Sequence, residues 1–315
     1  MSSGVMLVGE PMGLFIAQNE GPLDEVTGYS MAVAGAEFNV AVGLARLEHN
    51  VTYLTKLGSD PFGKLIVRVL SKNKIGSEFV SYSEDHSTGF MLKSRVTKGD
   101  PEIFYFRKNS AASTLSKKDV DRVDFSNYSF LHLTGILPAL SDTTREAVFY
   151  LIEKARENNL VISFDPNLRP QLWPDKETMV STINLIASKA DMVLPGEGEG
   201  ETLLGSRDPE VISDFYLGSG AKAVITKVGS RGAYLATGEE RCLVPGFKVD
   251  HIVDTVGAGD GFAAGVISAL MEGRNLKEAV LRGNAVGAIQ VMSRGDNDGL
   301  PYRDQLARFM GKESL

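Results

Sequence analysis

Cysteine, basic runs and long apolar segments are scarce in this sequence, and each shortage excludes a class of protein. Cys242 is the only cysteine among 315 residues, so the chain forms no internal disulfide. A lone cysteine suits a reducing compartment, which predicts a cytoplasmic location. Lys and Arg number 33 against 40 Asp and Glu, giving a net charge of −7. A chain this acidic, without basic runs, predicts no nucleic-acid partner and no binding to anionic membranes.

No segment is suited to enter a bilayer. The longest uncharged stretch, residues 125–141, is interrupted by Pro138 and several polar side chains. The first residues, MSSGVMLVGEP, lack the basic start and long apolar run of a secretory signal, so we expect no signal peptide. The histidines have no metal-ligand spacing, so we expect no histidine metal centre; they are His49, His86, His132 and His251.

Short apolar segments alternate with amphipathic ones along most of the chain. The apolar segments predict strands at 5–9, 51–58, 129–135, 160–165, 191–195 and 223–229. Helical spacing of apolar residues predicts helices at 37–48, 61–74, 141–158, 176–189, 208–218, 258–272, 276–292 and 301–311. Strands that alternate with helices form a mostly parallel sheet flanked by helices. Because no repeat or linker divides the chain, we expect one α/β domain over residues 1–315.

Two segments break this alternation. Residues 13–35 and 87–108 each read as a pair of strands around a turn, NEGP in the first and KGDPE in the second. Neither has a helix of its own to cover it. We expect them to form a small β lid inserted in the domain, although two peripheral hairpins would give the same pattern.

Loops that follow the expected strands are rich in Gly, Asn, Arg and acids: LTGILP, DPNLRP, LPGEGEGE, TKVGSRG and DTVGAGD. In α/β proteins ligands bind outside the carboxyl ends of the strands, where these loops lie. The last loop continues as DTVGAGDGFAAG (254–265), and apolar residues recur at helical spacing from position 262. Its glycines therefore lie at a helix N-terminus, which attracts anions. An ordinary glycine-rich turn would have a similar sequence. The position of Asp260 favours an anion site instead, because a carboxylate there could take a proton from a group beside a bound phosphate.

Two other nucleotide-binding motifs are incomplete. GSDPFGKL (58–65) begins like a Walker A loop, but Leu65 stands where that motif needs Ser or Thr to hold Mg²⁺. GAGDGF (257–262) fails the dinucleotide fingerprint, because Phe262 replaces the third glycine and the segment lies late in the chain. We therefore expect neither a P-loop protein nor an NAD-dependent dehydrogenase.

DTVGAGDGFAAGVI (254–267) resembles the C-terminal signature of the ribokinase-like carbohydrate kinases, the phosphofructokinase-B group. The resemblance covers nearly the whole chain, through AGAEFNVAVGLARL (34–47), LGSDPFG (57–63), DPNLR (165–169), TKVGSRGA (226–233) and GNAVGA (283–288). It implies a three-layer ribokinase-like fold, ATP as donor, a sugar hydroxyl as acceptor and Mg²⁺ carried by the nucleotide phosphates. It also allows a monovalent cation. In this family the lid closes over the sugar and often forms the dimer contact, which implies a homodimer or a higher oligomer.

The resemblance implies roles for individual residues. Asp260 is the expected general base, and the amides of Gly257, Ala258 and Gly259 are the expected anion hole for the phosphoryl group. The residues expected to contact the nucleotide are Asn167, Lys227, Gly229, Ser230, Gly232, Gly257, Gly259 and Asn284. The residues expected to contact the sugar are Gly35, Asn39, Phe90, Tyr105, Arg107, Arg169, Asp260 and Asp296. Glu199 is the expected partner of Mg²⁺, through water.

The choice of sugar depends on two arginines. EPMGLF (10–15) lacks the aspartate with which ribokinases and many fructokinases bind sugar hydroxyls. YFRKNSAAS (105–113) and GAEFN (35–39) instead resemble 2-keto-3-deoxygluconate kinases, in which an aromatic-aromatic-Arg triplet and a later Arg meet the acid sugar. Guanidinium groups match carboxylate geometry, so Arg107 and Arg169 favour phosphorylation of 2-keto-3-deoxygluconate to its 6-phosphate. Taken singly, Arg107 could instead be a surface charge at a strand end, and Arg169 could form a structural salt bridge.

Two positions depart from the family pattern, and two other functions stay open. Glu48 replaces a usual glycine. Gly196 stands where the Asn-x-x-Glu motif has Asn, and the loss of this Asn puts the water-mediated magnesium network in question. The first alternative is a fructokinase or another neutral-sugar kinase. The second is a sugar-binding regulator that kept the fold and lost catalysis; the intact Asp260 and glycine turn count against it.

Overall fold

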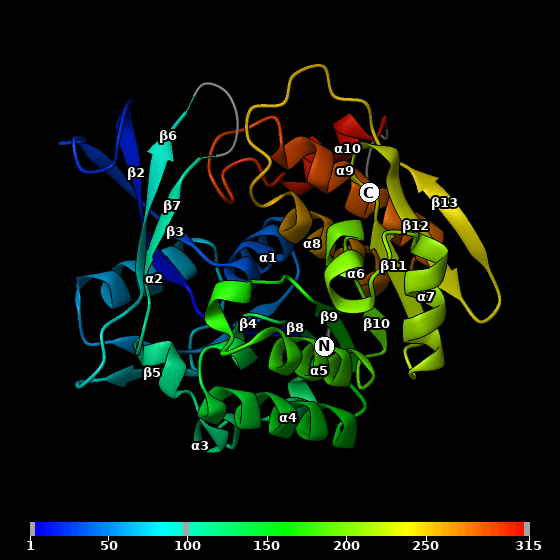
Figure 1. Cartoon of the computed structure of the whole chain (residues 1–315), viewed down its shortest axis with the longest axis horizontal. Coiled ribbons are helices and arrows are strands. Elements are labelled where there is room, and N and C mark those ends of the chain that lie inside the picture. Colours follow the sequence, from blue (N-terminus) through cyan, green and yellow to red (C-terminus); the bar gives the residue numbers. More distant parts are fainter. Residues whose placement is uncertain (1–3, 97–100, 312–315) are drawn as a thin grey trace.

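The computed structural model describes residues 4–96 and 101–311, which form a large sheet, a small sheet and two layers of helices (Figure 1). The large sheet has the strand order β13-β12-β11-β10-β9-β8-β1-β4-β5. Its strands are β1 (Gly4–Val8), β4 (Val51–Gly58), β5 (Val80–Ser83), β8 (Tyr128–Thr134), β9 (Val161–Asp165), β10 (Met192–Val193), β11 (Ala223–Lys227), β12 (Gly232–Thr237) and β13 (Arg241–Pro245). All pair in parallel except β12 and β13, which are antiparallel to their neighbours. The strand order reverses beside β1, and such a switch point is where α/β proteins bind ligands.

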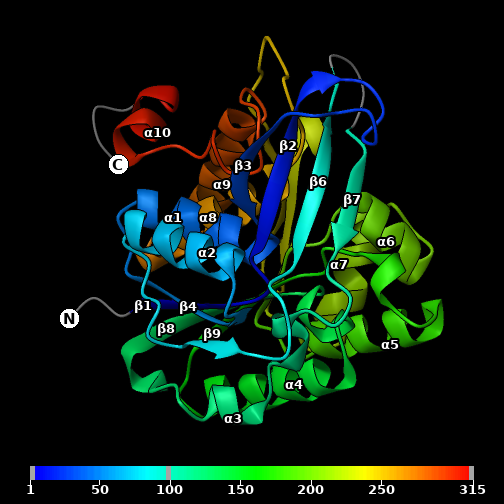
Figure 2. The same ribbon diagram turned by 90° about the vertical axis from the view of Figure 1, so that its left-hand side faces the viewer.

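Helices cover both faces of the large sheet (Figure 2). One layer contains α1 (Ala36–Arg46), α2 (Pro61–Lys72), α8 (Ala258–Met271), α9 (Leu276–Gln290) and α10 (Arg303–Phe309). The other contains α3 (Lys117–Val120), α4 (Asp142–Glu157), α5 (Lys176–Ala187), α6 (Glu197–Leu204) and α7 (Pro209–Gly218). Short 3₁₀ turns lie at Ala111–Thr114, Phe125–Asn127, Leu137–Ala139, Pro170–Leu172 and Gly229–Arg231. Each layer buries its own apolar cluster against the sheet, so the two clusters form the core.

Local sequence explains where the helices begin. The Asp60 side chain accepts a hydrogen bond from the Gly63 amide at 2.9 Å, and Pro61 takes the first helical position of α2. Ser141 accepts from the Thr144 amide at 3.1 Å at the start of α4. No helix in residues 4–96 and 101–311 is both long and apolar enough to cross a membrane.

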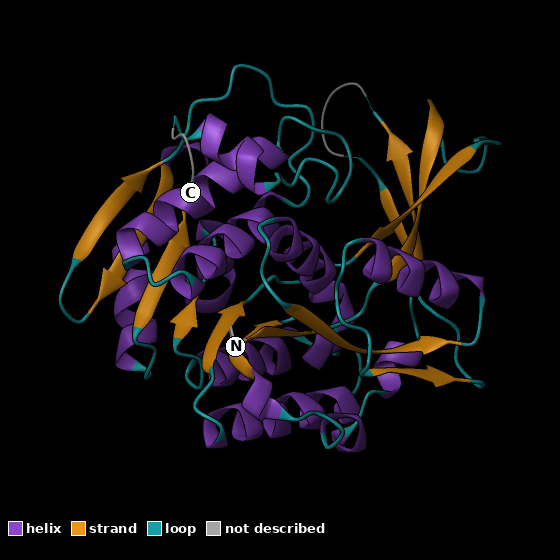
Figure 3. Ribbon diagram, turned by 180° about the vertical axis from the view of Figure 1, so that it is seen from behind, coloured by secondary structure: helices purple, strands orange, loops and turns teal. Residues whose placement is uncertain are grey.

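The small sheet stands beside the main body and is called the lid sheet here (Figure 3). It has the order β3-β2-β6-β7, and its strands are β2 (Met12–Glu20), β3 (Tyr29–Ala34), β6 (Phe90–Arg95) and β7 (Ile103–Phe106). The hairpins β2–β3 and β6–β7 are antiparallel, and they join through a parallel pairing of β2 with β6. The two segments that break the alternation thus supply its strands; residues 97–100 of the second segment lie outside the described residues.

The predicted fold class is confirmed, and the expected strands and helices of the main body occur within a few residues of their predicted bounds. Several elements were not predicted, among them the strand β5 and the short helix α3. GEGE (196–199) belongs to a segment predicted as loop, but α6 begins at Glu197, because the Glu199 carboxylate accepts from the Gly196 amide and caps the first turn. The hairpin β12–β13 was not predicted, although its strands extend the sheet beyond β11.

Candidate active site

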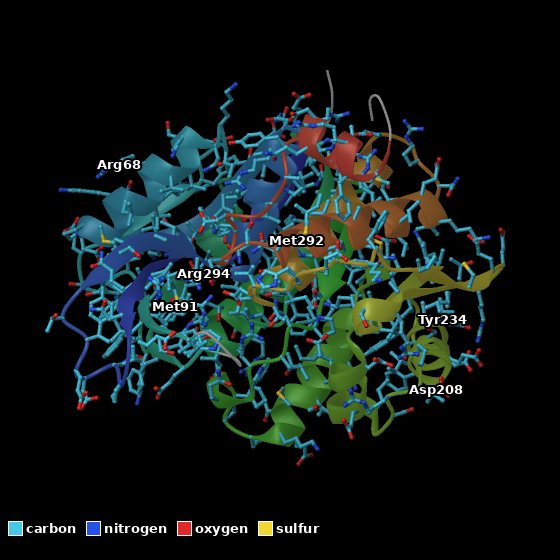
Figure 4. All side chains as sticks on the ribbon, turned by 90° about the horizontal axis from the view of Figure 1, so that it is seen from above. Arg68, Met91, Asp208, Tyr234, Met292 and Arg294 are labelled. Carbon is cyan, nitrogen blue, oxygen red and sulfur yellow. The ribbon has the colours of Figure 1, made fainter. Side chains whose placement is uncertain are left out.

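A cavity of about 340 Å³ lies where β9, β11 and the N-terminus of α8 meet the lid sheet, and we call it the Asp260 cavity. The expected sugar-binding residues that line it are Gly35, Asn39, Tyr105, Arg107, Arg169, Asp260 and Asp296. Met91 lines it from the lid sheet; Figure 4 shows this residue from above. Its walls therefore come from both the main body and the lid sheet.

Asp260 lies in the first turn of α8 and is partly buried. Asn39 Nδ2 donates to Asp260 Oδ2 at 2.7 Å, and Asn167 Nδ2 lies 3.5 Å from Asp260 Oδ1. Burial raises the pKa of Asp260 to about 7; the Asn39 hydrogen bond opposes this rise, the Asp165 carboxylate adds to it, and two nearby cations limit it. A carboxylate with such a pKa suits a general base that works near neutral pH.

The orientation of Asn39 is fixed by Asn297, a residue that was not predicted at the site. Asn297 Nδ2 donates to Asn39 Oδ1 at 2.8 Å and to the Val33 carbonyl at 3.0 Å. Because Oδ1 of Asn39 already accepts, its amide nitrogen faces Asp260. Arg46 holds this loop through the Asn297 carbonyl at 2.8 Å. Asn297 therefore positions the hydrogen bond that orients Asp260.

The turn before α8 requires bare backbone at Gly257. Its φ is 77°, in the left-handed region, and a Cβ there would lie 2.1 Å from the Asp296 carbonyl oxygen. Gly259 has more space, since the nearest atom to a Cβ would be Lys227 Nζ at 3.7 Å. The Ala258 amide makes a long contact of 3.4 Å with the Thr255 carbonyl. The amides at the start of α8 thus form a helix N-terminus suited to an anion, and Lys227 Nζ lies near Gly259.

Lys227 ends β11 and is held by acidic neighbours. Its Nζ donates to Asp165 Oδ2 at 2.5 Å. Burial alone would lower the pKa of Lys227, but the carboxylates of Asp165 and Glu199 outweigh burial and raise it. Glu199 accepts from the amides of Leu168 at 3.0 Å and Gly196 at 2.7 Å. Glu199 therefore fixes the loop after β9, and Lys227 remains charged.

Glu199 is the residue expected to meet Mg²⁺ through water. In the part of the chain that the structure describes, no three His, Cys, Asp or Glu side chains gather as a metal site. Glu199 lines the Asp260 cavity, and both of its oxygens already accept backbone hydrogen bonds. Its contact with Mg²⁺ through water stays a prediction.

A second cavity of about 330 Å³ adjoins the first, and we call it the Asn284 cavity. The expected nucleotide residues that line it are Lys227, Gly229, Ser230, Gly232, Gly259 and Asn284, whereas Asn167 and Gly257 line the Asp260 cavity. Much of its wall is apolar, from Phe247, Val249, Ile252 and Val291. Asn284 donates to the carbonyls of Val244 and Pro245, at 3.0 and 3.1 Å, so its amide holds the end of β13. This wall fits the flat apolar face of a nucleotide base.

Arg107 reaches the Asp260 cavity but already has an acidic partner. Its Nε donates to Glu10 Oε2 at 2.7 Å, and the Ser110 hydroxyl donates to the other oxygen of Glu10. Only 2% of Glu10 and 8% of Arg107 are exposed, so the pair is buried. The Arg107 guanidinium also lies 5.8 Å from the centre of the Tyr105 ring. Glu10 follows β1, at the start of the segment that lacks the aspartate expected of ribokinases, and its role was not predicted.

Arg169 is the second arginine of the Asp260 cavity and is partly buried. Its Nη1 donates to the Leu168 carbonyl at 2.8 Å. Its charge favours the ionised form of Asp260 and so lowers the pKa of that carboxyl. Arg107 is neutralised by Glu10, which makes Arg169 the better candidate for a substrate carboxylate.

Phe90 lies outside the Asp260 cavity, contrary to our expectation. Successive side chains of a strand point to opposite faces, and Met91 of β6 occupies the face toward the cavity. Phe90 stacks on Phe106 at 4.6 Å between ring centres and on Phe62 at 5.3 Å. It belongs to an aromatic cluster on the opposite face of the lid sheet.

Asp296 lines the Asp260 cavity but is also engaged. Lys93 Nζ of β6 donates to Asp296 Oδ1 and to Asp254 Oδ2, both at 2.9 Å. Burial raises the pKa of Asp296, and the Lys93 ammonium group opposes the rise. Neither Lys93 nor Asp254 was expected at the site, because this cluster joins residues far apart in the sequence.

The two cavities meet at the start of α8, since Lys227, Thr255 and Gly259 line both of them. A base, a helix N-terminus and a charged lysine therefore lie between a polar cavity and a largely apolar one. Phosphoryl transfer needs these parts: a group that takes a proton, fixed donors for the phosphoryl oxygens, and in-line positioning of donor and acceptor.

Comparison with known proteins agrees with this chemistry. The chain is 47% identical to the 2-dehydro-3-deoxygluconokinase of Bacillus subtilis, over 99% of this chain and 97% of the relative. It is 30% identical to a probable fructokinase of Arabidopsis thaliana, over 90% of this chain and 84% of that protein.

Solved structures are similar over the same length. A PfkB protein from Polaromonas sp. JS666 is 41% identical with a TM-score of 0.87, covering 95% of this chain and 99% of its own. An aminoimidazole riboside kinase from Salmonella enterica, complexed with aminoimidazole riboside and an ATP analogue, is 25% identical with a TM-score of 0.87; 98% of this chain and 100% of that chain are covered. The family model of the pfkB carbohydrate kinases matches residues 2–303, and the chain belongs to this family of kinases.

Proposed function

We propose that this kinase transfers the γ-phosphoryl group of ATP to the 6-hydroxyl of 2-keto-3-deoxygluconate, the sugar acid that is also called 2-dehydro-3-deoxygluconate. The observation that carries the proposal is the position of Asp260. Its carboxyl lies between a cavity with two arginines and a cavity suited to a nucleotide. The 47% identity to a 2-dehydro-3-deoxygluconokinase supports the same substrate.

Asp260 acts as the general base in this proposal. Its carboxylate takes the proton of the 6-hydroxyl, the sugar oxygen forms a bond to the γ-phosphorus, and the bond from that phosphorus to the β,γ-bridging oxygen breaks. The hydrogen bond from Asn39 holds Asp260 for this step. Amides at Gly257 and Gly259 face the phosphoryl oxygens and stabilise the charge that develops on them.

The nucleotide occupies the Asn284 cavity in this proposal, with its base against the apolar wall and its phosphates toward Gly259 and Lys227. Mg²⁺ arrives on the phosphates and neutralises part of their charge when bound. Lys227 adds a fixed positive charge where the two cavities meet, and Asp165 keeps it in place.

Arg169 recognises the carboxylate of the acid sugar in this proposal, and Arg107 and Tyr105 position the sugar from the lid sheet. A charged hydrogen bond of this kind contributes about 1.5–3 kcal/mol. Glu10 keeps Arg107 paired when the cavity is empty, so Arg107 need not remain unpaired between turnovers.

A direct test is to mix the purified protein with ATP, Mg²⁺ and 2-keto-3-deoxygluconate and to locate the new phosphate by NMR. Phosphate on the 6-oxygen supports the proposal. No product with the acid sugar, together with turnover of fructose, would favour the fructokinase alternative. No ATP consumption with any sugar would favour the non-catalytic regulator.

We also propose that the protein is a cytoplasmic homodimer joined through its lid sheets. The face of the lid sheet away from the cavity exposes Met31, Phe104 and Phe106 by 56%, 55% and 44%. Exposed apolar side chains gathered on one sheet face favour a partner surface. A single species of monomer mass in sedimentation at micromolar concentration would contradict the dimer. Whether a monovalent cation is needed can be tested by comparing turnover in potassium and choline salts.

A further inference from the structure

Lys93 lies in β6 on the face that carries Met91, and its ammonium group is buried against two carboxylates. Its Nζ is 2.9 Å from both Asp254 Oδ2 and Asp296 Oδ1. The exposed fractions of the three side chains are 5%, 12% and 7%. Buried charges are costly unless they are paired, so these groups act as one unit with a net charge of −1.

Asp254 and Asp296 both border the turn that leads into α8, Asp254 through its carboxylate and Asp296 through its backbone. Asp254 Oδ1 accepts from the Val256 amide at 3.0 Å. The backbone of Asp296 packs on Gly257, where a Cβ would lie 2.1 Å from the Asp296 carbonyl oxygen. The Asp254 carboxylate therefore binds the amide one residue before Gly257, and Asp296 lines the same cavity as Gly257 and Gly259, so excess charge on this pair acts near the amides that we expect to receive the phosphoryl group.

The lysine also separates two cavities. Lys93 and Asp254 line a cavity of about 260 Å³ beside the lid sheet, whereas Asp296 lines the Asp260 cavity. Burial alone would lower the pKa of Lys93, but Asp296 and Asp254 outweigh burial and raise it. The ammonium group is therefore charged, and it screens the Asp296 carboxylate on the side away from the Asp260 cavity.

We propose that Lys93 is a positioning residue for phosphoryl transfer: it neutralises Asp254 and Asp296 and keeps excess negative charge away from the turn at Gly257. This rests on the kinase function proposed above. Lys93 lies outside the lining of the Asp260 cavity and acts through the two carboxylates. Because it belongs to the lid sheet, it reaches them only while the lid sheet packs against residues 254 and 296.

Lys93→Met removes the charge and keeps most of the side-chain volume. We expect kcat to fall about 10²-fold, the size of effect that misplacing a catalytic group by about 1 Å can have. The KM for ATP should stay almost unchanged, since the Asn284 cavity is not altered. Lys108→Met is the matched control, because Lys108 is exposed just beyond β7 and should keep wild-type kcat.

The double variant Lys93→Met/Asp254→Asn separates charge from structure. It restores the net charge of −1, and the amide side chain introduced at position 254 keeps an oxygen that can accept from the Val256 amide. We expect it to fold and to recover kcat to within about tenfold of wild type, which loss of packing alone would not allow. If Lys93→Met folds poorly, the double variant carries the test by itself.

Three results would overturn the proposal: wild-type kcat in Lys93→Met, a double variant that does not fold, or a double variant that folds and stays about 10²-fold slow. Failure of the proposed substrate is distinguishable from these. Wild-type protein would then be inactive on 2-keto-3-deoxygluconate, and the variants would be compared on the sugar that it does phosphorylate.

Discussion

Replacing Asp260 by Asn removes the ionisable group at the start of α8 and keeps its size. The Asn side-chain oxygen can still accept the 2.7 Å hydrogen bond from Asn39. Loss of a general base lowers turnover by about 10²–10⁴-fold. Nucleotide binding should persist, because the Asn284 cavity does not include this side chain.

The same change should stabilise the protein above neutral pH. Burial raises the pKa of Asp260 from 3.8 to about 7, so the folded protein binds more protons than the unfolded chain between about pH 4 and pH 7. Stability from this group is therefore lost as pH rises through that window. The full shift corresponds to about 4 kcal/mol at about 1.4 kcal/mol per pH unit. Because Asp260 is only partly buried, water screens much of this, and we expect about 1–2 kcal/mol.

Urea unfolding of wild type and Asp260→Asn at pH 8 and pH 5 measures this difference. We expect the variant to be more stable at pH 8, and the gap to shrink at pH 5, where the wild-type carboxyl is largely protonated. Burial also raises the pKa of Glu37 to about 7. Because Glu37 is present in both proteins, its contribution to their difference in stability cancels. Asp250→Asn, at an exposed position, is the control. Equal stability at pH 8, or near-normal turnover of the folded variant, would refute the reasoning.

The remaining predictions concern the pH profile, the two arginines and Glu48. The kcat/KM of wild type should rise with pH up to about 7 as Asp260 ionises and then level off; a flat profile from pH 5 to 8 would contradict its role as base. Arg169→Ala should lower kcat/KM on the acid sugar about 10–100-fold and on fructose much less. Arg107→Ala should in addition destabilise folding by about 3–5 kcal/mol, because Glu10 is left buried and unpaired, and equal melting temperatures for the two variants would contradict this. Glu48→Gly should raise the free energy of unfolding by about 0.5–1 kcal/mol, since Glu48 has a left-handed φ of 67°; a loss of stability in urea would contradict the strain.

Local sequence was enough to predict most of the fold. Apolar spacing located the strands and helices, and glycines followed by a helical pattern placed Asp260 in the first turn of α8. The departure at Glu48 also has a local explanation, because its left-handed backbone suits the glycine that the family has there. These features depend on residues close together in the chain, so they can be read from sequence.

Long-range pairs could not be predicted in the same way. Asn297 contacts Asn39 across 258 positions, and Lys93 contacts Asp296 across 203. Asp254 and Asp296 both lie in segments whose sequence is typical of a turn. The sequence therefore gave no reason to pair either of them with Lys93. Phe90 was expected at the sugar, but its ring packs against Phe62 and Phe106, since the alternation of a strand pattern does not say which of its two faces meets the cavity.

Selection of an acid sugar by the Asp260 cavity is tested most directly by the kcat/KM of wild-type protein for 2-keto-3-deoxygluconate and for fructose. ADP release gives the readout for both sugars. We expect a preference for the acid sugar of at least about tenfold, because a neutral hexose leaves Arg169 without a charged partner. Equal efficiency on the two sugars, or a preference for fructose, would contradict this selection.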